Sequence, residues 1–367
     1  IQKPKNFPPG PRPLPIFGNL LHFNINNPLK DFGLLAERYG NVYSLYLGRS
    51  PAVVLNGLKA IKEALVTKSA DFSGRPQNLL ISHMMEGKGV IMADYGPAWK
   101  EHRRFALMTL RNFGLGKESM ENRILGEIEH LVVKLEKHAG SVLNPQTLFH
   151  DAVSNINYLM LSGTRYEYER CQQEIDEVLQ GKSHVSFEDR HNMPYTQAVI
   201  HEVQRIANVT PLSVFHSTTR DTELMGYSIP KVMISNSGLI YLLLPILMLS
   251  IHCFQGTIII PNLSSVLSEE GQWKFPHEFN PSNFLNEQGQ FEKPEAFIPF
   301  SAGPRLCLGE GLARMELFLI LVSLLRRFQF IWPEDAGEPD FTPVFGATLT
   351  PKPYKMGIRL RQPASEI

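Results

Sequence analysis

One ten-residue stretch constrains this chain more than any other: Phe300-Ser-Ala-Gly303-Pro-Arg305-Leu-Cys307-Leu-Gly309. Its cysteine stands among glycines, follows an arginine by two residues, and precedes an apolar pattern with helical period. Because glycine has no side chain, the backbone at Gly303 and Gly309 can turn tightly and lie close to a flat ligand. The stretch therefore predicts a tight loop that presents Cys307 just before a helix.

Ligation of haem iron is the chemistry that suits this cysteine. A thiolate is a strong axial ligand that pushes electron density onto the metal and favours O–O cleavage. The forked donors of Arg305 match a haem propionate. The alternative interpretation is a buried structural cysteine beside a turn. The three cysteines, Cys171, Cys253 and Cys307, lie far apart, so we expect no disulfide framework.

Length and charge limit the other classes of function. The 367 residues are enough for one large domain or two ordinary ones. Lys plus Arg and Asp plus Glu both total 36, so the net charge is near zero and nothing points to nucleic acid as a partner. No signal-peptide pattern opens the chain.

Two short helical patterns carry paired polar groups. Trp99 and Arg103 are four residues apart, hence on one helical face, and both can donate to an anion. The alternative is a core tryptophan beside a surface arginine. Glu202 and Arg205 lie three apart in a helical run over 196–207, which predicts an ion pair. This second pattern alone is not specific, because Glu101-His-Arg-Arg104 matches it too.

These residues together resemble the cytochrome P-450 superfamily, most closely its vertebrate family 2 microsomal members. The resemblance implies a mainly α fold with a small β region, haem b as cofactor and Cys307 as the thiolate ligand. It implies that Glu202 and Arg205 form a structural pair. In the family a basic residue often joins that pair, and Asn283 stands at its place, so we expect a neutral third contact.

The resemblance also assigns roles around the cofactor and the substrate. It implies that the haem is held by Trp99, Arg103, His216, Arg305, Phe300, Gly303 and Gly309. His216 alone would more simply be a surface or satisfied core histidine. On the substrate side it implies Val214, Phe215 and Phe345.

The activity implied is NADPH-dependent monooxygenation, with electrons delivered by a reductase. Substrates would be small lipophilic compounds such as fatty acids, steroids or xenobiotics. The place implied is the cytosolic face of the endoplasmic reticulum membrane, with residues 1–19 as a Pro-rich hinge after an anchor that this chain lacks. The alternative for that segment is a generic Pro-rich linker or an SH3 ligand. We expect a single domain over residues 1–367.

The chain departs from the family pattern at two places. The (Ala/Gly)-Gly-x-acid-Thr-Thr motif, whose acid and threonine help deliver protons to dioxygen in the family, is missing. Up to about Tyr168 the sequence resembles the segment before the family's central helices, and from Glu169 it resembles the segment after them. The fold is therefore expected to be truncated in its middle. An apolar insert occupies residues 232–255, between segments that are contiguous in the family.

Each departure leaves an alternative open. Loss of the central block favours a non-catalytic or misfolded splice or gene-model variant that at most binds haem. The insert has two interpretations. One is a transmembrane segment over 238–260. The other is a retained in-frame intron, since valine codons begin with GT and CAG is a glutamine codon.

Overall fold

The computed structural model describes residues 5–24, 26–77, 79–112, 114, 118–144, 165–233, 254–346 and 348–361. The chain divides into two compact units, and each is described by itself. Unit 1 comprises Ile1–Ala106, Thr210–Glu269 and Phe300–Cys307, and unit 2 comprises Leu107–Val209, Glu270–Pro299 and Leu308–Ile367. The single domain expected over residues 1–367 stays a prediction. Cys253 and most of the insert lie outside the described residues.

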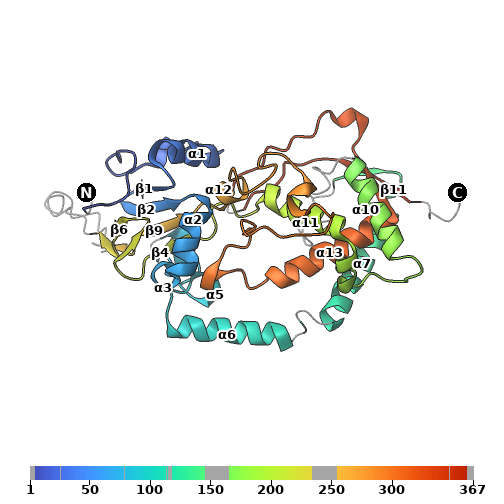
Figure 1. The fold of residues 1–367 in the computed structure, drawn as a ribbon, viewed down its shortest axis with the longest axis horizontal. Helices are drawn as coiled ribbons and strands as arrows, with labels where there is room; N and C mark the ends of the chain where they lie inside the picture. Colours follow the sequence, from blue (N-terminus) through green and yellow to red (C-terminus); the bar gives the residue numbers. More distant parts are fainter. Residues whose placement is uncertain are drawn as a thin grey trace. The chain divides into compact units, whose positions relative to one another are not determined.

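Unit 1 is built around a four-stranded sheet in the order β1-β2-β9-β4 (Figure 1). β1 (Val42–Leu47) and β2 (Ser50–Leu55) form a hairpin, which turns at Gly48. β9 (Ile258–Pro261) runs parallel to β2, and β4 (His216–Ser217) is antiparallel to β9. All residues of β2 and β9 are buried, as expected for strands covered on both faces.

Short helices and turns complete unit 1. Its other elements are α1 (Pro28–Tyr39), α2 (Gly57–Lys62), the π-helical turn η2 (Glu63–Thr67), α3 (Ser69–Phe72), α4 (Leu80–Met84), α5 (Gly89–Met92), α12 (Leu263–Leu267), η1 (Leu20–His22), η5 (Gly303–Arg305), β5 (Thr222–Leu224) and β6 (Tyr227–Ile229). Phe32 of α1 packs on the sheet against Tyr43 and Leu45. α6 (Pro97–Asn112) begins in unit 1.

The Pro-rich lead-in is held against β1. Ser44 N donates to Pro9 O at 2.6 Å, and Ser44 Oγ donates to Pro8 O at 2.8 Å. A Cβ on Gly10 would lie 2.0 Å from Ser44 O, so only glycine fits there. The role of residues 1–19 as a hinge stays a prediction.

The described ends of the insert lie together. β7 (Val232–Met233) and β8 (Phe254–Gln255) pair as antiparallel strands. Gly256 N donates to Lys231 O at 2.6 Å. The chain therefore enters and leaves the insert at one point of unit 1.

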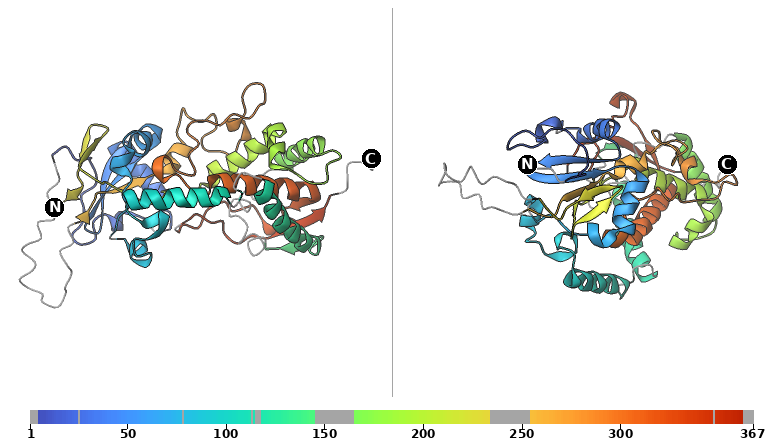
Figure 2. Two further views of the ribbon diagram at one scale, coloured as in Figure 1. Left: turned by 90° about the horizontal axis from the view of Figure 1, so that it is seen from below. Right: turned by 60° about the vertical axis from the view of Figure 1, so that its left-hand side comes forward.

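Unit 2 is a helical body with a small sheet, seen from three directions in Figures 1 and 2. Its helix α13 packs against three others. The helices are α7 (Glu118–Glu136), α10 (Arg165–Val178), α11 (Pro194–Ala207) and α13 (Glu310–Arg327), with the short turns η3 (Phe187–Asn192), η4 (Pro281–Phe284) and η6 (Glu334–Ala336). The sheet order is β10 (Phe328–Ile331), β11 (Met356–Leu360), β3 (Val142–Leu143). The predicted helices over 196–207 and after Cys307 are confirmed, as is the mainly α fold.

Candidate functional site

The cysteine loop is a compact turn in unit 1. Leu306 N donates to Gly303 O at 3.0 Å, and Cys307 N donates to Phe300 O at 3.1 Å. The thiol of Cys307 is exposed, whereas the other described cysteine, Cys171, is buried. The loop thus presents one accessible sulfur, as the sequence predicts.

The two glycines of this loop differ in what they contribute. Gly303 has φ +71°, and a Cβ there would lie 1.8 Å from Leu65 O. Any other residue would push the loop away from the π-helical turn η2. Gly309 has φ −91°, which all residues adopt, so our argument for a tight turn holds at Gly303 and is wrong for Gly309.

Trp99 and Arg103 share one face of α6, as predicted. Trp99 is 3% exposed, and its indole Nε1 donates to Val90 O at 2.9 Å. Arg103 is half-buried, and its Nη2 donates to Leu306 O at 2.6 Å, next to Cys307. Guanidinium groups lie over the Trp99 ring at 4.0 Å (Arg305) and 5.7 Å (Arg103). The tryptophan is a platform for cations, since its only N–H already has an acceptor.

Arg305 is buried and donates to three backbone carbonyls. Its Nε binds Ser73 O at 3.0 Å, Nη1 binds Val90 O at 3.2 Å and Nη2 binds Ala93 O at 2.8 Å. The pKa of Arg305 is lowered to about 10, mainly by burial; the charge of Asp94 opposes this shift, and that of Arg103 adds to it. The guanidinium is held rigidly in a place that disfavours its own charge.

His216 is buried, and only one of its two ring nitrogens has a hydrogen-bond partner. Its Nδ1 lies 2.8 Å from Phe72 O, and because a carbonyl only accepts, Nδ1 carries the proton. Its Nε2 is buried without a hydrogen-bond partner. Burial, and next the charge of Arg75, hold the pKa of His216 well below its usual range. An unsatisfied buried nitrogen is costly and marks a place for a ligand.

Arg75 is a member of this cluster that the sequence analysis missed. Its side chain is buried, with Nη1 bound to Val214 O at 3.0 Å and to Phe215 O at 2.8 Å. Its Nε donates to Ile91 O at 2.8 Å. Burial, and then the charge of Arg305, lower the pKa of Arg75 to about 9. No spacing rule marks this residue, since its partners are backbone carbonyls far along the chain.

Three arginines form a positively charged site beside one carboxylate, Asp94, which raises the pKa of Arg75 and Arg305 without forming a salt bridge to either. We call Arg75, Arg103 and Arg305, together with the neutral His216, the cation cluster. Within the described residues, none of its three arginines forms a salt bridge, and Asp94 accepts from the Arg75 backbone N at 3.0 Å. Buried charges require pairing, so the cluster fits a ligand with carboxylates. The propionates of a haem beside an exposed cysteine meet that requirement.

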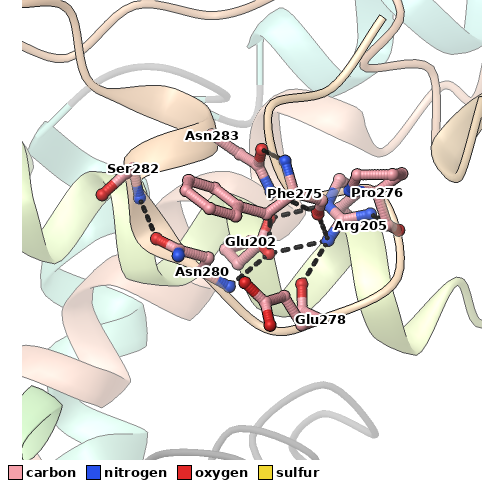
Figure 3. Close-up of polar contacts among 8 residues, drawn as sticks. All are labelled: Glu202, Arg205, Phe275, Pro276, Glu278, Asn280, Ser282 and Asn283. Atoms are coloured by element: carbon pink, nitrogen blue, oxygen red, sulfur yellow. Dashed lines mark hydrogen bonds and ion pairs between the residues drawn. The ribbon is translucent and has the colours of Figure 1, made fainter. Parts of the chain in front are cut away.

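The second predicted constellation, Glu202 and Arg205 in unit 2, is satisfied by the protein itself (Figure 3). Arg205 Nε donates to Glu202 Oε2 at 2.7 Å and Nη2 to Oε1 at 2.8 Å. Burial raises the pKa of Glu202, and the bonds from Arg205 oppose that shift.

Loop residues complete this network. Arg205 also donates to three carbonyls, those of Phe275, Pro276 and Glu278. Asn283 Nδ2 donates to Glu202 Oε1 at 3.1 Å, which confirms the expected neutral third contact. Each guanidinium nitrogen of Arg205 and each carboxylate oxygen of Glu202 thus has a partner within the described residues.

The residues expected on the substrate side lie in different surroundings. Val214 is exposed, whereas Phe215 packs against the core of the unit 1 sheet. Phe345 belongs to unit 2 and is half-buried in a turn, which Val344 and Thr350 close by pairing. Their contact with a substrate stays a prediction.

Comparison with known proteins identifies the family. The model of the family "Cytochrome P450" matches residues 8–169, 167–235 and 251–358. The chain belongs to the cytochrome P450 family. Cytochrome P450 2D3 of Rattus norvegicus is 33% identical, covering 95% of this chain and 92% of the relative. Cytochrome P450 2D6 of Homo sapiens is 33% identical, covering 95% of this chain and 93% of the relative. Cytochrome P450 2K4 of Oncorhynchus mykiss is 32% identical, covering 95% of this chain and 91% of the relative.

Family membership sets the enzyme class and the cofactor. Cytochrome P450 proteins are haem-thiolate monooxygenases, with haem b as cofactor and electrons from NADPH through a reductase. Lipophilic compounds are their general substrates. Within the described residues no helix has the length and apolarity to cross a membrane.

The match is interrupted where the sequence departs from the family pattern. It breaks near residue 168 and again between residues 235 and 251. The alignment with the rat relative extends over 484 positions, 117 more than the 367 residues of this chain. A block of residues that the relatives contain is therefore absent from the interior of this chain.

Proposed function

We propose that unit 1 binds haem b through the Cys307 thiolate and the cation cluster. We further propose that the haem-loaded protein oxygenates a small lipophilic substrate such as a fatty acid, steroid or xenobiotic. Electrons would come from NADPH through a reductase. The observation that carries this proposal is the convergence of three arginines and an unpartnered histidine nitrogen beside one exposed cysteine. Haem supplies the oxygen-activating chemistry when it is bound.

The protein's own residues have separable roles in this proposal. Cys307 would supply the sulfur ligand to iron, and Arg103 donates to the carbonyl of Leu306, the residue before it. Arg75, Arg305 and His216 bind the propionates, whose charge offsets that of the arginines. Taking a carboxylate at Nε2 requires His216 to become doubly protonated, since Nδ1 already donates to Phe72 O.

Apolar side chains next to the cluster support a lipophilic substrate. Arg75 binds the carbonyls of Ile91 and Val214, so these two residues lie directly beside it. Their side chains are 54% and 38% exposed. Such apolar surface beside a reactive centre favours a ligand without strong polar groups.

A membrane surface is the place we propose for the protein, at the cytosolic face of the endoplasmic reticulum. Large apolar side chains are exposed at Ile16 (70%), Phe17 (52%) and Leu21 (67%). The first acidic residue of the chain is Asp31, whereas Lys5 and Arg12 precede the apolar group. Apolar and basic groups together favour anionic lipid interfaces.

A second candidate function is haem binding without turnover. The missing interior block and the missing acid-threonine motif favour it, since the cation cluster can hold haem without either. This candidate shares the haem site with the first and differs in the oxygen chemistry.

Two measurements on the full chain separate these candidates. We expect the reduced carbon-monoxide difference spectrum of the haem-loaded protein to show a red-shifted, thiolate-type Soret band that Cys307→Ala abolishes and Cys171→Ala keeps. A histidine-type band, or none, would overturn both candidates. NADPH- and reductase-dependent hydroxylation of laurate then supports the monooxygenase. Its absence in a protein with the thiolate band supports the haem binder.

A further inference from the structure

Unit 2 contains a cavity that has no part in the haem site. Its volume is about 280 Å³, near the lower end of small-molecule sites, which are about 300–1,000 Å³. It lies between α11, η3 and the first turns of α13, and Phe291 closes one side. Its size suits a ligand of one ring.

Four of the nine residues that line this cavity have aromatic rings. Phe187 and Phe318 meet edge to face, with ring centroids 5.9 Å apart at 71°. Phe291 and His201 form a tilted pair at 4.5 Å. Burial lowers the pKa of His201 to about 3, so this ring is neutral near pH 7 and acts as a further flat wall. Aromatic faces and edges of this kind favour an inserted ring.

Two arginines supply positive charge to the same cavity. Arg190 stacks over Phe187 at 4.0 Å and binds Glu188 at 3.0 Å. Arg314 pairs with Glu310 at 2.5 Å through Nη2, while its Nε is buried without a partner. One N–H of Arg314 therefore lacks an acceptor beside an aromatic space.

The start of α13 also borders this end of the cavity. Gly311 lines the cavity, and a Cβ there would meet nothing within 4 Å, so the backbone of the first turn is accessible. The N-cap residue, Gly309, provides no side-chain bond. The first turn of this 18-residue helix, which carries the positive end of the helix dipole, thus borders the cavity at Gly311.

We propose that this cavity binds a small aromatic carboxylate, with the ring between Phe291 and Phe318 and the carboxylate at Arg314 Nε and the start of α13. A carboxylate satisfies the unpaired Nε, and the positive end of the helix dipole favours its charge. Glu310 competes for the same arginine, so the ligand binds against one resident negative charge. The site is independent of haem, because all its residues belong to unit 2.

Benzoate and its neutral analogue benzamide are the probes for this site. In calorimetric titration of the haem-free full chain, we expect saturable binding of benzoate and at least about tenfold weaker binding of benzamide. Arg314→Gln should weaken benzoate binding at least about tenfold, and Arg190→Gln should weaken it less. Glu310→Gln should strengthen it, an effect that a damaged fold does not produce.

Arg326→Gln is the matched control, because Arg326 lies on the same helix and binds the carbonyls of Lys182 and Ser183 instead. The affinity of the Arg326→Gln variant for benzoate should equal that of the unchanged protein. Equal binding of benzoate and benzamide, no saturable benzoate binding, or affinity unchanged by both Arg314→Gln and Glu310→Gln would overturn the proposal. None of these outcomes bears on the haem site.

Discussion

Buried arginines of the two units have opposite electrostatic surroundings. In unit 2, Arg205 is bidentate to Glu202 and donates to three carbonyls, so its charge is balanced within the fold. In unit 1, Arg75 and Arg305 donate to backbone carbonyls and form no salt bridge in the described part of the chain. A neighbouring arginine lowers the pKa of each, and Asp94 opposes that shift.

This difference separates a structural network from a binding site. A complete network leaves nothing for a ligand, and its value is stability and conformational specificity. An incomplete network keeps buried arginines without a salt-bridge partner, which is energetically unfavourable until an anion binds beside them. We therefore assign Glu202 and Arg205 to the fold, and the cation cluster to the cofactor.

The largest effect is expected in the complete network. Glu202→Ala should lower the free energy of unfolding by about 3–5 kcal/mol, because it leaves the Arg205 charge buried and unpaired. The double change Glu202→Leu with Arg205→Leu should lower the free energy of unfolding by less than Glu202→Ala does. Urea unfolding followed by far-UV circular dichroism measures both. A loss below about 1 kcal/mol for Glu202→Ala would contradict a buried pair.

Changes in the incomplete cluster should act on haem affinity instead. Arg75→Gln and Arg305→Gln should each weaken haem binding at least about tenfold, since hydrogen bonds to charged groups contribute about 1.5–3 kcal/mol. Stability of the haem-free protein should change less, because each change also relieves repulsion between like charges. Haem titration at the Soret band checks this, with Arg326→Gln as control. Equal losses in the control would show a nonspecific charge effect.

The two buried histidines give a pH test of the comparison. Both pKa values are lowered on folding, so the unfolded chain binds more protons below about pH 6.5 and stability falls as pH falls through that range. His216→Gln should reduce the slope of stability against pH by up to about 1.4 kcal/mol per pH unit. Haem should have the same effect, since a propionate at Nε2 raises the pKa of His216.

The share of the slope from His201 should remain in both cases, because that ring lies in unit 2. Unfolding curves between pH 7 and pH 5, with and without haem, measure these slopes. The same slope in His216→Gln and the unchanged protein would mean that His216 is not held neutral.

Short-range patterns were predicted from the sequence because their geometry is local. Spacings of three and four residues on a helix fixed the pairs Glu202–Arg205 and Trp99–Arg103, and the confirmed contact of Asn283 followed from the family pattern. Trp99 shows the limit of this reasoning. Its predicted N–H for a propionate already binds Val90 O, a contact that no spacing reveals.

Long-range contacts were not predicted. Arg75 enters the cluster through carbonyls that lie up to 140 residues away, and the parallel pairing of β2 with β9 joins segments more than 200 residues apart. Such neighbours depend on tertiary packing, which local propensity does not encode. The argument from glycine failed at Gly309 for a related reason, because the backbone there has an ordinary φ.

Removal of the insert should have the smallest effect. Deleting residues 232–255 joins Lys231 to Gly256, which already share a 2.6 Å hydrogen bond. We expect the melting temperature and the haem affinity to stay the same or to rise slightly, since a shorter loop costs less entropy. Thermal unfolding and haem titration of the deletion variant test this. Loss of haem binding would show that the insert is part of the site's support.

Haem titration against the dimethyl ester of the same haem tests the central claim most directly, because only the propionate charges differ. The cation cluster predicts that iron protoporphyrin IX binds at least about a hundredfold more tightly than its ester, with the thiolate-type Soret band in both complexes. His216→Gln together with Arg305→Gln should remove most of that preference. Equal affinity for the two haems would contradict the claim that the buried cations of unit 1 are completed by the cofactor.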